Sequence, residues 1–251
     1  MAELERKNVE VFDRDAAHNE GYLYTHTSRL SCRLATGRST DIILGTGEFQ
    51  GHSVLDAACG DAFYTVRFWD RGGATRIVAA DAAVKAVEVG TRHSHPRPIR
   101  FLAGDAHRMP FANDSFDVVL LQSVLHHDDD PPHMIREAFR IAPTVIVHEP
   151  NGNNLGLKAI EKTSRYHVEH GEKSYTTRRM RGWIEAAGGR VVYRKMAGFV
   201  PMFCPDWMAR AMKFLEPAIE WTPVCRSLAC SAYVMVGTRK PPGPPSSKML
   251  I

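Results

Sequence analysis

Short apolar runs alternate with amphipathic stretches through the middle of the chain. Five runs rich in Val, Ile, Leu and Ala predict β-strands, and three of the stretches between them carry the spacing of α-helices. The predicted strands are 52–57, 76–80, 99–103, 116–122 and 144–148, and the predicted helices are 61–71, 82–91 and 131–141. Strands separated by helices predict an α/β fold with a parallel sheet and right-handed crossovers.

Two of these helices carry sequence signals at their ends. Gly72 and Gly73 end the first helix, as glycine does at a C-terminal cap. Asp130 is a favoured N-cap residue, and Pro131 and Pro132 fit the first turn, where a missing amide hydrogen costs little.

The outer segments follow a different pattern. Residues 1–15 are highly charged, and apolar and aromatic residues recur at helical spacing over 16–38, which predicts one or two capping helices, with another turn over 39–43. The polar stretch 151–177 predicts a mobile loop or a short helical lid. Beyond it we predict a helix over 177–187, strands over 190–196 and 232–236, and an insertion at 198–231 whose stripe of Met208, Ala211, Met212, Leu215 and Ile219 packs on the core.

No internal repeat or shift in composition marks a second domain. We therefore predict one domain over 1–240, followed by a disordered Pro-rich tail over 241–251. Its parts are an N-terminal helical cap (1–45), a ligand-binding core (50–150) and a lid with the last strands (151–240).

Composition and charge are those of an ordinary soluble globular protein. Hydrophobic residues make up 44% and charged residues 24%, and 32 Lys and Arg against 28 Asp and Glu give a net charge of +4. The excess is scattered, and Arg178, Arg179 and Arg181 are expected on a solvated helix face, so we expect neither nucleic acid nor a membrane as a partner. The polar N-terminus and the lack of an apolar run near the bilayer-spanning length of about 20 residues predict a cytoplasmic protein.

Neither a disulfide framework nor a metal site is expected. The five cysteines are odd in number and form no CxxC pair. The run 126–133, H-H-D-D-D-P-P-H, invites a metal interpretation, but its prolines break the geometry and its aspartates suit the start of a helix.

Three acidic residues stand where predicted strands end. Asp56 follows the first strand, Asp81 ends the second, and Asp105 follows the third after Gly104. Open parallel sheets bind ligands along the edge formed by the carboxyl ends of their strands, so three carboxylates there predict a binding site. Asp81 taken alone is equally explained as a helix N-cap.

The turn after the first strand narrows the class of ligand. A dinucleotide site needs G-x-G-x-x-G, with the pyrophosphate at a helix N-terminus. Residues 59–64, C-G-D-A-F-Y, keep only Gly60, and Asp61 places a negative charge where the pyrophosphate would lie. These features argue against NAD, FAD and ATP and favour a ligand with an adenosine, a ribose diol and a cationic end.

Together these residues resemble the motifs of class I S-adenosylmethionine-dependent methyltransferases, of the broad type 11 that includes ubiquinone- and menaquinone-biosynthesis enzymes. Residues 56–62 match D-x-x-x-G-x-G, with Ala62 in place of the last glycine. Asp81 matches the second acidic position, 104–106 (G-D-A) the third motif, and 118–127 (V-V-L-L-Q-S-V-L-H-H) the fourth-strand signature. The K-P-G-G turn usual before the fifth strand is absent.

The resemblance covers roughly residues 50–150. It implies a Rossmann-like fold with a seven-stranded, mostly parallel sheet, helices on both faces, an N-terminal helical cap and an insertion before the last strand. It also implies S-adenosylmethionine as methyl donor and S-adenosylhomocysteine as product.

Carried over by position, the resemblance assigns roles within this core. Gly60 lets the backbone approach the methionine portion of S-adenosylmethionine. Asp81 accepts hydrogen bonds from the ribose hydroxyls, and Asp105 faces the adenine amino group. The cofactor-binding residues that it implies are Asp56, Ala58, Gly60, Asp81, Ala82, Asp105, Ala106 and Gln122. The methyl of Ala62 either crowds the ligand or is tolerated by a small shift.

Methyl transfer requires the nucleophile and the methyl carbon in line at about 3 Å, and a base if the nucleophile carries a proton. His126 and His127 follow the fourth strand beside the expected methyl position, and Glu149 ends the fifth, so these three are the catalytic candidates. His148 at the end of the fifth strand could also point into the pocket. Tyr22, Tyr24 and His26 of an N-terminal wall and Tyr166, His167 and His170 of the lid are further candidates, for which packing or surface positions are favoured. Phe199, Met202, Phe203, Trp207 and Trp221 could roof an apolar substrate.

The leading hypothesis is therefore a methyltransferase acting on a small-molecule acceptor, with oxygen slightly favoured over nitrogen or carbon. A nicotinamide-dependent oxidoreductase shares the fold but needs the missing glycines. A non-catalytic module that binds S-adenosylmethionine or S-adenosylhomocysteine is the third possibility, in which Ala62 marks the loss of activity.

Overall fold

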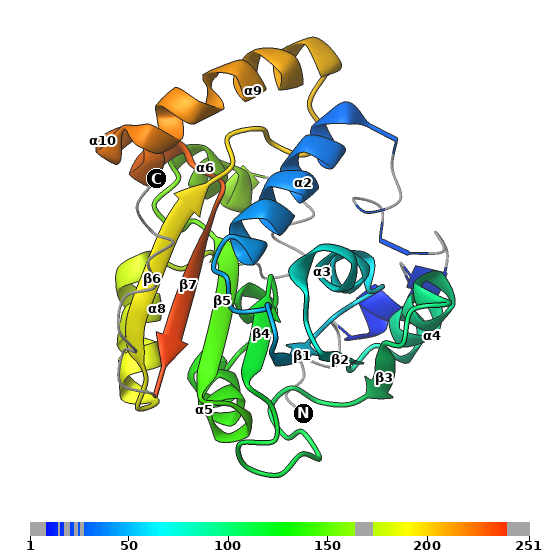
Figure 1. Ribbon diagram of the computed structural model, residues 1–251. Helices are drawn as coiled ribbons and strands as arrows, with labels where there is room; N and C mark the ends of the chain where they lie inside the picture. Colours follow the sequence, from blue (N-terminus) through cyan, green and yellow to red (C-terminus); the bar gives the residue numbers. More distant parts are fainter. Residues whose placement is uncertain are drawn as a thin grey trace.

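The computed structural model describes residues 9–14, 16–17, 21–22, 25, 28–163 and 173–239. In this part of the chain, seven strands form one sheet of order β3-β2-β1-β4-β5-β7-β6 (Figure 1). Neighbouring strands from β3 to β5 are parallel, and β7 runs antiparallel to both β5 and β6. The predicted α/β fold with a mostly parallel, seven-stranded sheet is confirmed.

The strands are β1 (Ser53–Ala57), β2 (Arg76–Asp81), β3 (Arg100–Ala103), β4 (Val118–Gln122), β5 (Thr144–Pro150), β6 (Arg190–Ala197) and β7 (Ala232–Thr238). The helices are α2 (Leu30–Leu44), α3 (Phe63–Gly72), α4 (Val84–Ser94), α5 (Pro131–Ile141), α6 (Leu155–Thr163), α8 (Thr177–Ala186), α9 (Asp206–Trp221) and α10 (Pro223–Ala229), with a 3₁₀ turn η1 (Leu125–His127). No helix in the described ranges is long and apolar enough to cross a bilayer.

Strand side chains alternate between two buried faces of the sheet, because successive residues of a strand point to opposite sides. Leu55 lies on the face covered by α5 and α8. Val54 lies on the opposite face, which α2 and α3 cover. Both faces are apolar, which explains why the strand sequences are nearly continuous hydrophobic runs.

Local sequence signals set several boundaries. Helix α5 has the predicted bounds, because the Asp130 side chain accepts a hydrogen bond from the His133 amide at 3.2 Å and prolines occupy the first turn. Helix α3 starts two residues later than predicted, because Ala62 has a φ of 61° and therefore precedes the helix.

The predicted cap and lid are described in part. Helix α2 continues through the turn predicted over 39–43, and α6 makes the start of the lid helical. The candidates Tyr24, His26, Tyr166, His167 and His170, and the predicted tail over 241–251, lie outside the described residues.

The loops that follow β1 to β5 gather at one end of the sheet. Strand β6 runs in the same direction as these strands, since both β5 and β6 are antiparallel to β7. The connection from β6 to β7 therefore crosses the same end, where α9 and α10 lie beside α6 (Figure 1). The predicted site residues and the insertion share one side of the molecule.

Candidate functional site

The turn after β1 is shaped by alternate residues with positive φ. Ala58, Gly60 and Ala62 have φ values of 67°, 55° and 61°. This conformation costs an alanine roughly 1 kcal/mol or more, and it is retained here at two alanines. The Cys59 amide connects the turn to β2, because it donates a hydrogen bond to the Ala80 carbonyl at 2.9 Å. It carries the backbone of Gly60 toward the end of β2.

The methyl of Ala62 is accommodated by helix α4. Ala62 is fully buried, and a Cβ added at Gly90 would lie 2.8 Å from its methyl carbon. Gly90 therefore leaves the space that the extra methyl needs. Of the two outcomes predicted for Ala62, the structure favours the second: its methyl points toward α4, where Gly90 leaves room for it.

Asp81 connects the turn to the start of α4. Its Oδ2 accepts a hydrogen bond from the Gly60 amide at 2.7 Å, and its Oδ1 accepts one from the Ala83 amide at 2.8 Å. The N-cap residue of α4 is Ala83, so Asp81 is not that cap. Burial raises the pKa of this carboxyl above its ordinary value. A carboxylate has about four acceptor positions, so two donors leave capacity for a diol.

Asp56 is buried behind the turn. Its Oδ2 accepts a hydrogen bond from the Thr65 hydroxyl at 2.6 Å, which places it against helix α3. Burial raises the pKa of Asp56 to about 7, and the nearby charge of Asp81 adds to the rise. Asp56 and Asp81 therefore form a buried pair of carboxyls in which the proton is held on Asp56 more tightly than in water.

Asp105 belongs to a second cluster that the sequence analysis missed. Its Oδ1 accepts a hydrogen bond from the His107 amide at 2.8 Å and lies 3.1 Å from Nδ1 of that ring. Nε2 of His107 lies 3.1 Å from Oδ2 of Asp128. The hydrogen bond to Asp128, assisted by Asp105, raises the pKa of His107 to about 9, so the ring is cationic at neutral pH.

The cationic ring ties the loop after β3 to the loop after β4. His107 and Asp128 are 21 residues apart and share no recognisable spacing, so only the fold brings them together. Asp105 remains partly exposed, and within the described ranges its Oδ2 has no hydrogen-bond donor. This oxygen is available to an amino group.

Glu149 anchors the segment that carries the two candidate histidines. Its carboxylate is fully buried. Oε1 accepts hydrogen bonds from the amides of Val124 and Leu125 at 2.9 and 2.8 Å, and Oε2 lies 2.7 Å from Nδ1 of His126. The carboxylate thus closes the turn η1 and fixes the orientation of the His126 ring. These contacts favour a positioning role for Glu149.

His127 faces the N-terminal segment. Its ring lies 3.9 Å from the ring of His126 and 5.1 Å from that of Phe12. In the rest of the run 126–133, Asp128 and His133 lie against His107, and Asp130 lies at the start of α5. Among the residues that the structure describes, no three His, Cys, Asp or Glu side chains are grouped to hold a metal ion.

Gln122 and His148 are register partners at the ends of β4 and β5. Both are buried, and neither the Gln122 Nε2 nor the His148 Nε2 has a hydrogen-bond partner in the described part of the chain. Burial lowers the pKa of His148 to about 4, so its ring is neutral. An unsatisfied buried donor costs about 1–3 kcal/mol. A bound ligand with an acceptor atom near the Gln122 amide would remove this cost.

Asp61 attaches the N-terminal segment to the turn. Its Oδ2 accepts hydrogen bonds from the Tyr22 amide at 2.9 Å and from the Thr25 hydroxyl at 2.5 Å. The ring of Tyr22 covers Gly60 so closely that a Cβ there would lie 2.5 Å from it. Any side chain at position 60 would displace this ring. The predicted N-terminal wall is thus present at Tyr22.

The insertion does not place its tryptophans over this site. Trp207 and Trp221 of α9 are 72% and 82% exposed, so the prediction that they roof an apolar substrate is wrong. Met208 and Met212 pack against α2, as the predicted stripe requires. Ala211 and Leu215 of the same stripe are exposed, which the prediction did not anticipate.

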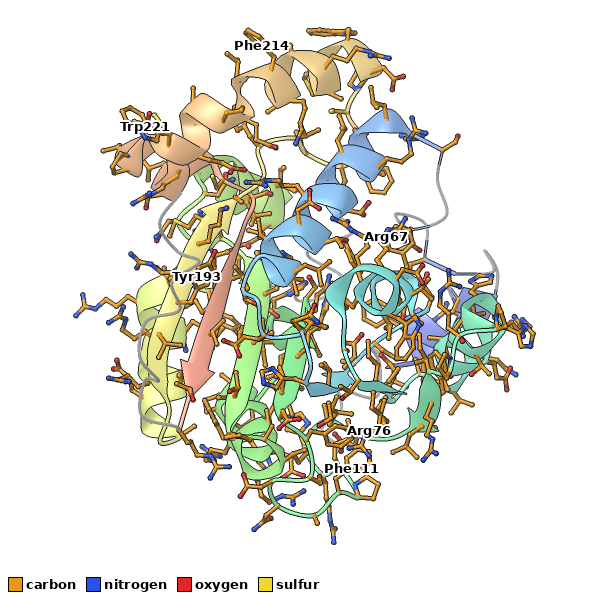
Figure 2. The ribbon with its side chains drawn as sticks, viewed as in Figure 1. Arg67, Arg76, Phe111, Tyr193, Phe214 and Trp221 are labelled. Atoms are coloured by element: carbon orange, nitrogen blue, oxygen red, sulfur yellow. The ribbon has the colours of Figure 1, made fainter. Side chains whose placement is uncertain are left out.

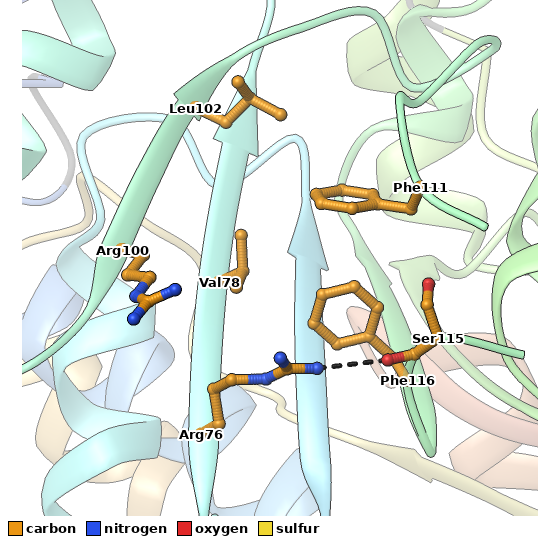
Figure 3. Close-up of a pocket in the computed structure, with 7 residues that line it drawn as sticks. All are labelled: Arg76, Val78, Arg100, Leu102, Phe111, Ser115 and Phe116. Carbon is orange, nitrogen blue, oxygen red and sulfur yellow. Dashed lines mark hydrogen bonds between the residues drawn. The ribbon is translucent and has the colours of Figure 1, made fainter.

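A separate hollow of about 270 Å³ lies on the sheet face beside β2 and β3 (Figure 3). Arg76 crosses its edge, stacks on the ring of Phe116 and donates a hydrogen bond to the Ser115 carbonyl at 3.1 Å. The lining residues are Arg76, Val78, Arg100, Leu102, Phe111, Ser115 and Phe116. None of them is a predicted site residue, so this hollow is distinct from the site at the carboxyl ends.

Comparisons with known proteins show which family and fold the chain is similar to. Residues 55–143 match a family model described as a methyltransferase domain. Demethylmenaquinone methyltransferase of Renibacterium salmoninarum is 34% identical over 101 residues, which are 40% of each chain, and that of Mycolicibacterium paratuberculosis is 38% identical over 104 residues, 41% of this chain and 42% of the other. The chain thus spans about two-fifths of the length of the curated relatives it matches.

A solved structure extends the likeness of fold to nearly the whole chain. Magnesium protoporphyrin IX methyltransferase of Synechocystis, solved with S-adenosylhomocysteine, aligns with a TM-score of 0.67 at 13% identity. The alignment covers 94% of this chain and 100% of that one.

Proposed function

We propose that this chain, a class I methyltransferase by its matched domain and its fold, transfers the methyl group of S-adenosylmethionine to a small-molecule acceptor. The observation that carries the proposal is the turn after β1. Its alternating positive φ values bring the Gly60 amide onto Asp81, and the unsatisfied Gln122 amide lies buried at the end of β4.

The residues present fit an adenosyl ligand. Asp81 keeps acceptor capacity for the ribose hydroxyls, and Oδ2 of Asp105 is available to the adenine amino group. The carboxyl of Asp81 favours the cationic end of a ligand, and the Gln122 amide offers a donor to an acceptor atom of the same ligand. Ala58, Ala82 and Ala106 add backbone and small side chains to the same loops. When bound, the cosubstrate would supply an electrophilic methyl on a sulfonium.

The chain's own contribution to the chemistry is orientation and proton handling. Because Nδ1 of His126 is engaged by Glu149, Nε2 is the ring atom that would accept a proton from an acceptor hydroxyl or amine. We assign Glu149 to positioning His126, and His127 to the wall beside it. Tyr22, closing over Gly60, helps to exclude water from this end of the turn.

The acceptor proposed is an apolar, ring-bearing small molecule. The matched relatives are named for demethylmenaquinone, and the matched structure is named for a magnesium porphyrin. Both names describe large unsaturated ring systems. Transfer to oxygen rather than nitrogen or carbon stays a prediction, which product analysis by mass spectrometry and NMR would test.

A thermal-shift experiment tests the cosubstrate. S-adenosylmethionine and S-adenosylhomocysteine are each expected to raise the melting temperature, and NADH to leave it unchanged, since ligand binding to the native state stabilises it. Asp81→Asn should reduce the shift, because an amide presents only one acceptor oxygen. Asp114→Asn, a change of an exposed carboxylate in the loop before β4, is the matched control. A shift with NADH alone would favour the oxidoreductase, and no shift with either adenosyl ligand would overturn the proposal.

Turnover separates an enzyme from a binding module. The protein with S-adenosylmethionine and a panel of quinol, phenol and porphyrin acceptors should release S-adenosylhomocysteine. Binding of S-adenosylmethionine without product on that panel would favour the non-catalytic module.

A further inference from the structure

Helix α9 packs its methionines against α2 but also carries large aromatic residues on its solvent side and a buried acid on its inward side. Phe214 is 85% exposed, and Trp207 and Trp221 are similarly open to solvent, whereas Glu216 is only 4% exposed. A helix on the surface of a globular protein normally turns its apolar stripe inward and its charges outward. The outward stripe therefore requires an explanation other than packing within this chain.

The inward-facing acids of α9 are held by specific partners. Glu216 accepts a hydrogen bond from the Phe199 amide at 3.0 Å, and Glu220 accepts one from the Gly198 amide at 3.0 Å. Arg38 of α2 forms an ion pair with Glu220, and Lys213 pairs with Glu216. These contacts fix the rotation of α9 about its axis, so the fold itself presents the aromatic side outward.

The three aromatic residues follow one side of α9, with Pro217 between the second and the third. Trp207, Phe214 and Trp221 are spaced by seven residues, which is nearly two helical turns, so they lie on one side of α9 over about 21 Å. We call them the aromatic stripe. Val224 and Leu228 of α10 continue the exposed apolar surface. Figure 2 shows Phe214 and Trp221 at the outer margin of the molecule.

The charge beside the aromatic stripe is positive. Arg210 of α9 and Arg226 of α10 are exposed, and Arg29 lies over the ring of Phe203 at 5.6 Å. The acids Glu216 and Glu220 are turned inward and paired, which leaves Asp206 as the exposed acid of α9. The net result is an apolar surface with a cationic border.

From this combination we propose that the aromatic stripe docks onto an anionic lipid bilayer. A helix with tryptophan and phenylalanine on one side and basic residues beside them lies in the interface, where aromatic rings insert among the headgroups and cations meet anionic lipid. A second copy of the chain is the alternative occupant, and the cationic border favours an anionic lipid surface over a second cationic one. The expectation that no membrane is a partner rested on the scatter of charge along the sequence. In the fold, Arg210 and Arg226 lie near the aromatic stripe.

The docking surface lies at the same end of the sheet as the candidate site. An apolar acceptor dissolved in a bilayer would therefore reach the site from the docked side. That link rests on the proposed function, whereas bilayer binding itself does not, so the two are tested apart.

Vesicle co-sedimentation of the full chain tests the docking. The protein should bind vesicles of equal phosphatidylcholine and phosphatidylglycerol, with weaker binding to phosphatidylcholine alone. The triple variant Trp207→Ser, Phe214→Ser, Trp221→Ser should lose at least about ten-fold in partitioning. Arg210→Gln and Arg226→Gln should each lose roughly five-fold on the anionic vesicles. Val192→Ser, which removes an exposed apolar side chain from β6, is the matched control and should bind as the natural protein does.

A second measurement needs no variant. Lipids brominated in their acyl chains should quench the tryptophan fluorescence of the natural protein and shift its emission to shorter wavelength if Trp207 and Trp221 insert. Absence of binding and quenching, or equal binding by the triple variant, would overturn the proposal. A dimer in sedimentation equilibrium that the triple variant dissociates, without any vesicle binding, would assign the surface to a second copy instead.

Discussion

Replacing Asp56 by asparagine should make this protein progressively more stable than its natural form as pH rises from about 4 to 8. The carboxyl is buried against α3 and its pKa is raised to about 7, chiefly by burial and further by Asp81. The amide introduced by Asp56→Asn would keep an oxygen that accepts the Thr65 hydroxyl hydrogen bond, which is now 2.6 Å long, and it cannot ionise.

The sign follows from proton binding. In the native protein the Asp56 carboxyl holds its proton more tightly than in the unfolded chain, where its pKa is near 3.8. The stabilisation by that bound proton is fully present below pH 3.8 and is lost as pH rises through 7. The pKa rises from 3.8 to about 7, which is about 3 pH units. Each pH unit corresponds to 1.36 kcal/mol, so the total change in the free energy of unfolding is about 4 kcal/mol.

Urea unfolding of both proteins at about pH 4.5, 6 and 8 measures this difference. The gap in free energy of unfolding should widen by about 3 kcal/mol in favour of Asp56→Asn across this range, since part of the total is already lost below about pH 4.5. Asp70→Asn is a control of opposite sign, because the hydrogen bond from Arg97 lowers the pKa of Asp70. A gap between Asp56→Asn and the natural protein that stays constant with pH would refute the assignment of a protonated Asp56 carboxyl.

Three further changes test the other contacts of the site. His107→Asn should destabilise the protein by about 2 kcal/mol at neutral pH and by little at pH 10. The reason is that the raised pKa of His107 contributes stability that is fully present below pH 6.5 and is lost as pH rises through about 9. A loss of stability that does not vary with pH would contradict this. Glu149→Gln should lower the free energy of unfolding in urea by about 3 kcal/mol, since it removes the charged partner of the buried His126 ring. It should also lower kcat more than it changes KM. An unchanged kcat with an active acceptor would exclude the positioning role. Gly90→Ala should cost about 1–3 kcal/mol through contact with the Ala62 methyl, and adding Ala62→Gly should restore most of the loss, whereas additive effects would show that the two positions do not compete for space.

The core of the fold could be predicted from the sequence because its signals are local. The strands are runs of apolar residues, and α5 carries its N-cap and prolines within four residues of its start. The acids at the strand ends could also be placed, since parallel strands share one carboxyl edge.

The arrangement of side chains at that edge could not be predicted in the same way. His107 meets Asp128, and Tyr22 meets Asp61, only because the loops after separate strands converge. No spacing along the chain encodes such contacts. The same holds for Gly90, which matters to Ala62 only through the packing of α4.

Helix α9 shows most clearly where the sequence and the tertiary structure divide. Its periodicity predicted a helix with one inward stripe from Met208 to Ile219, because helical spacing depends on neighbours three and four residues away, but it did not predict the outward row of aromatics. Which side faces inward was decided by Arg38 and the amides at 198 and 199, which capture Glu220 and Glu216 and turn the aromatic stripe to the outside. The sequence by itself determined the elements and the acids of the turn after β1, while the long-range pairing of charges decided which surfaces those elements present.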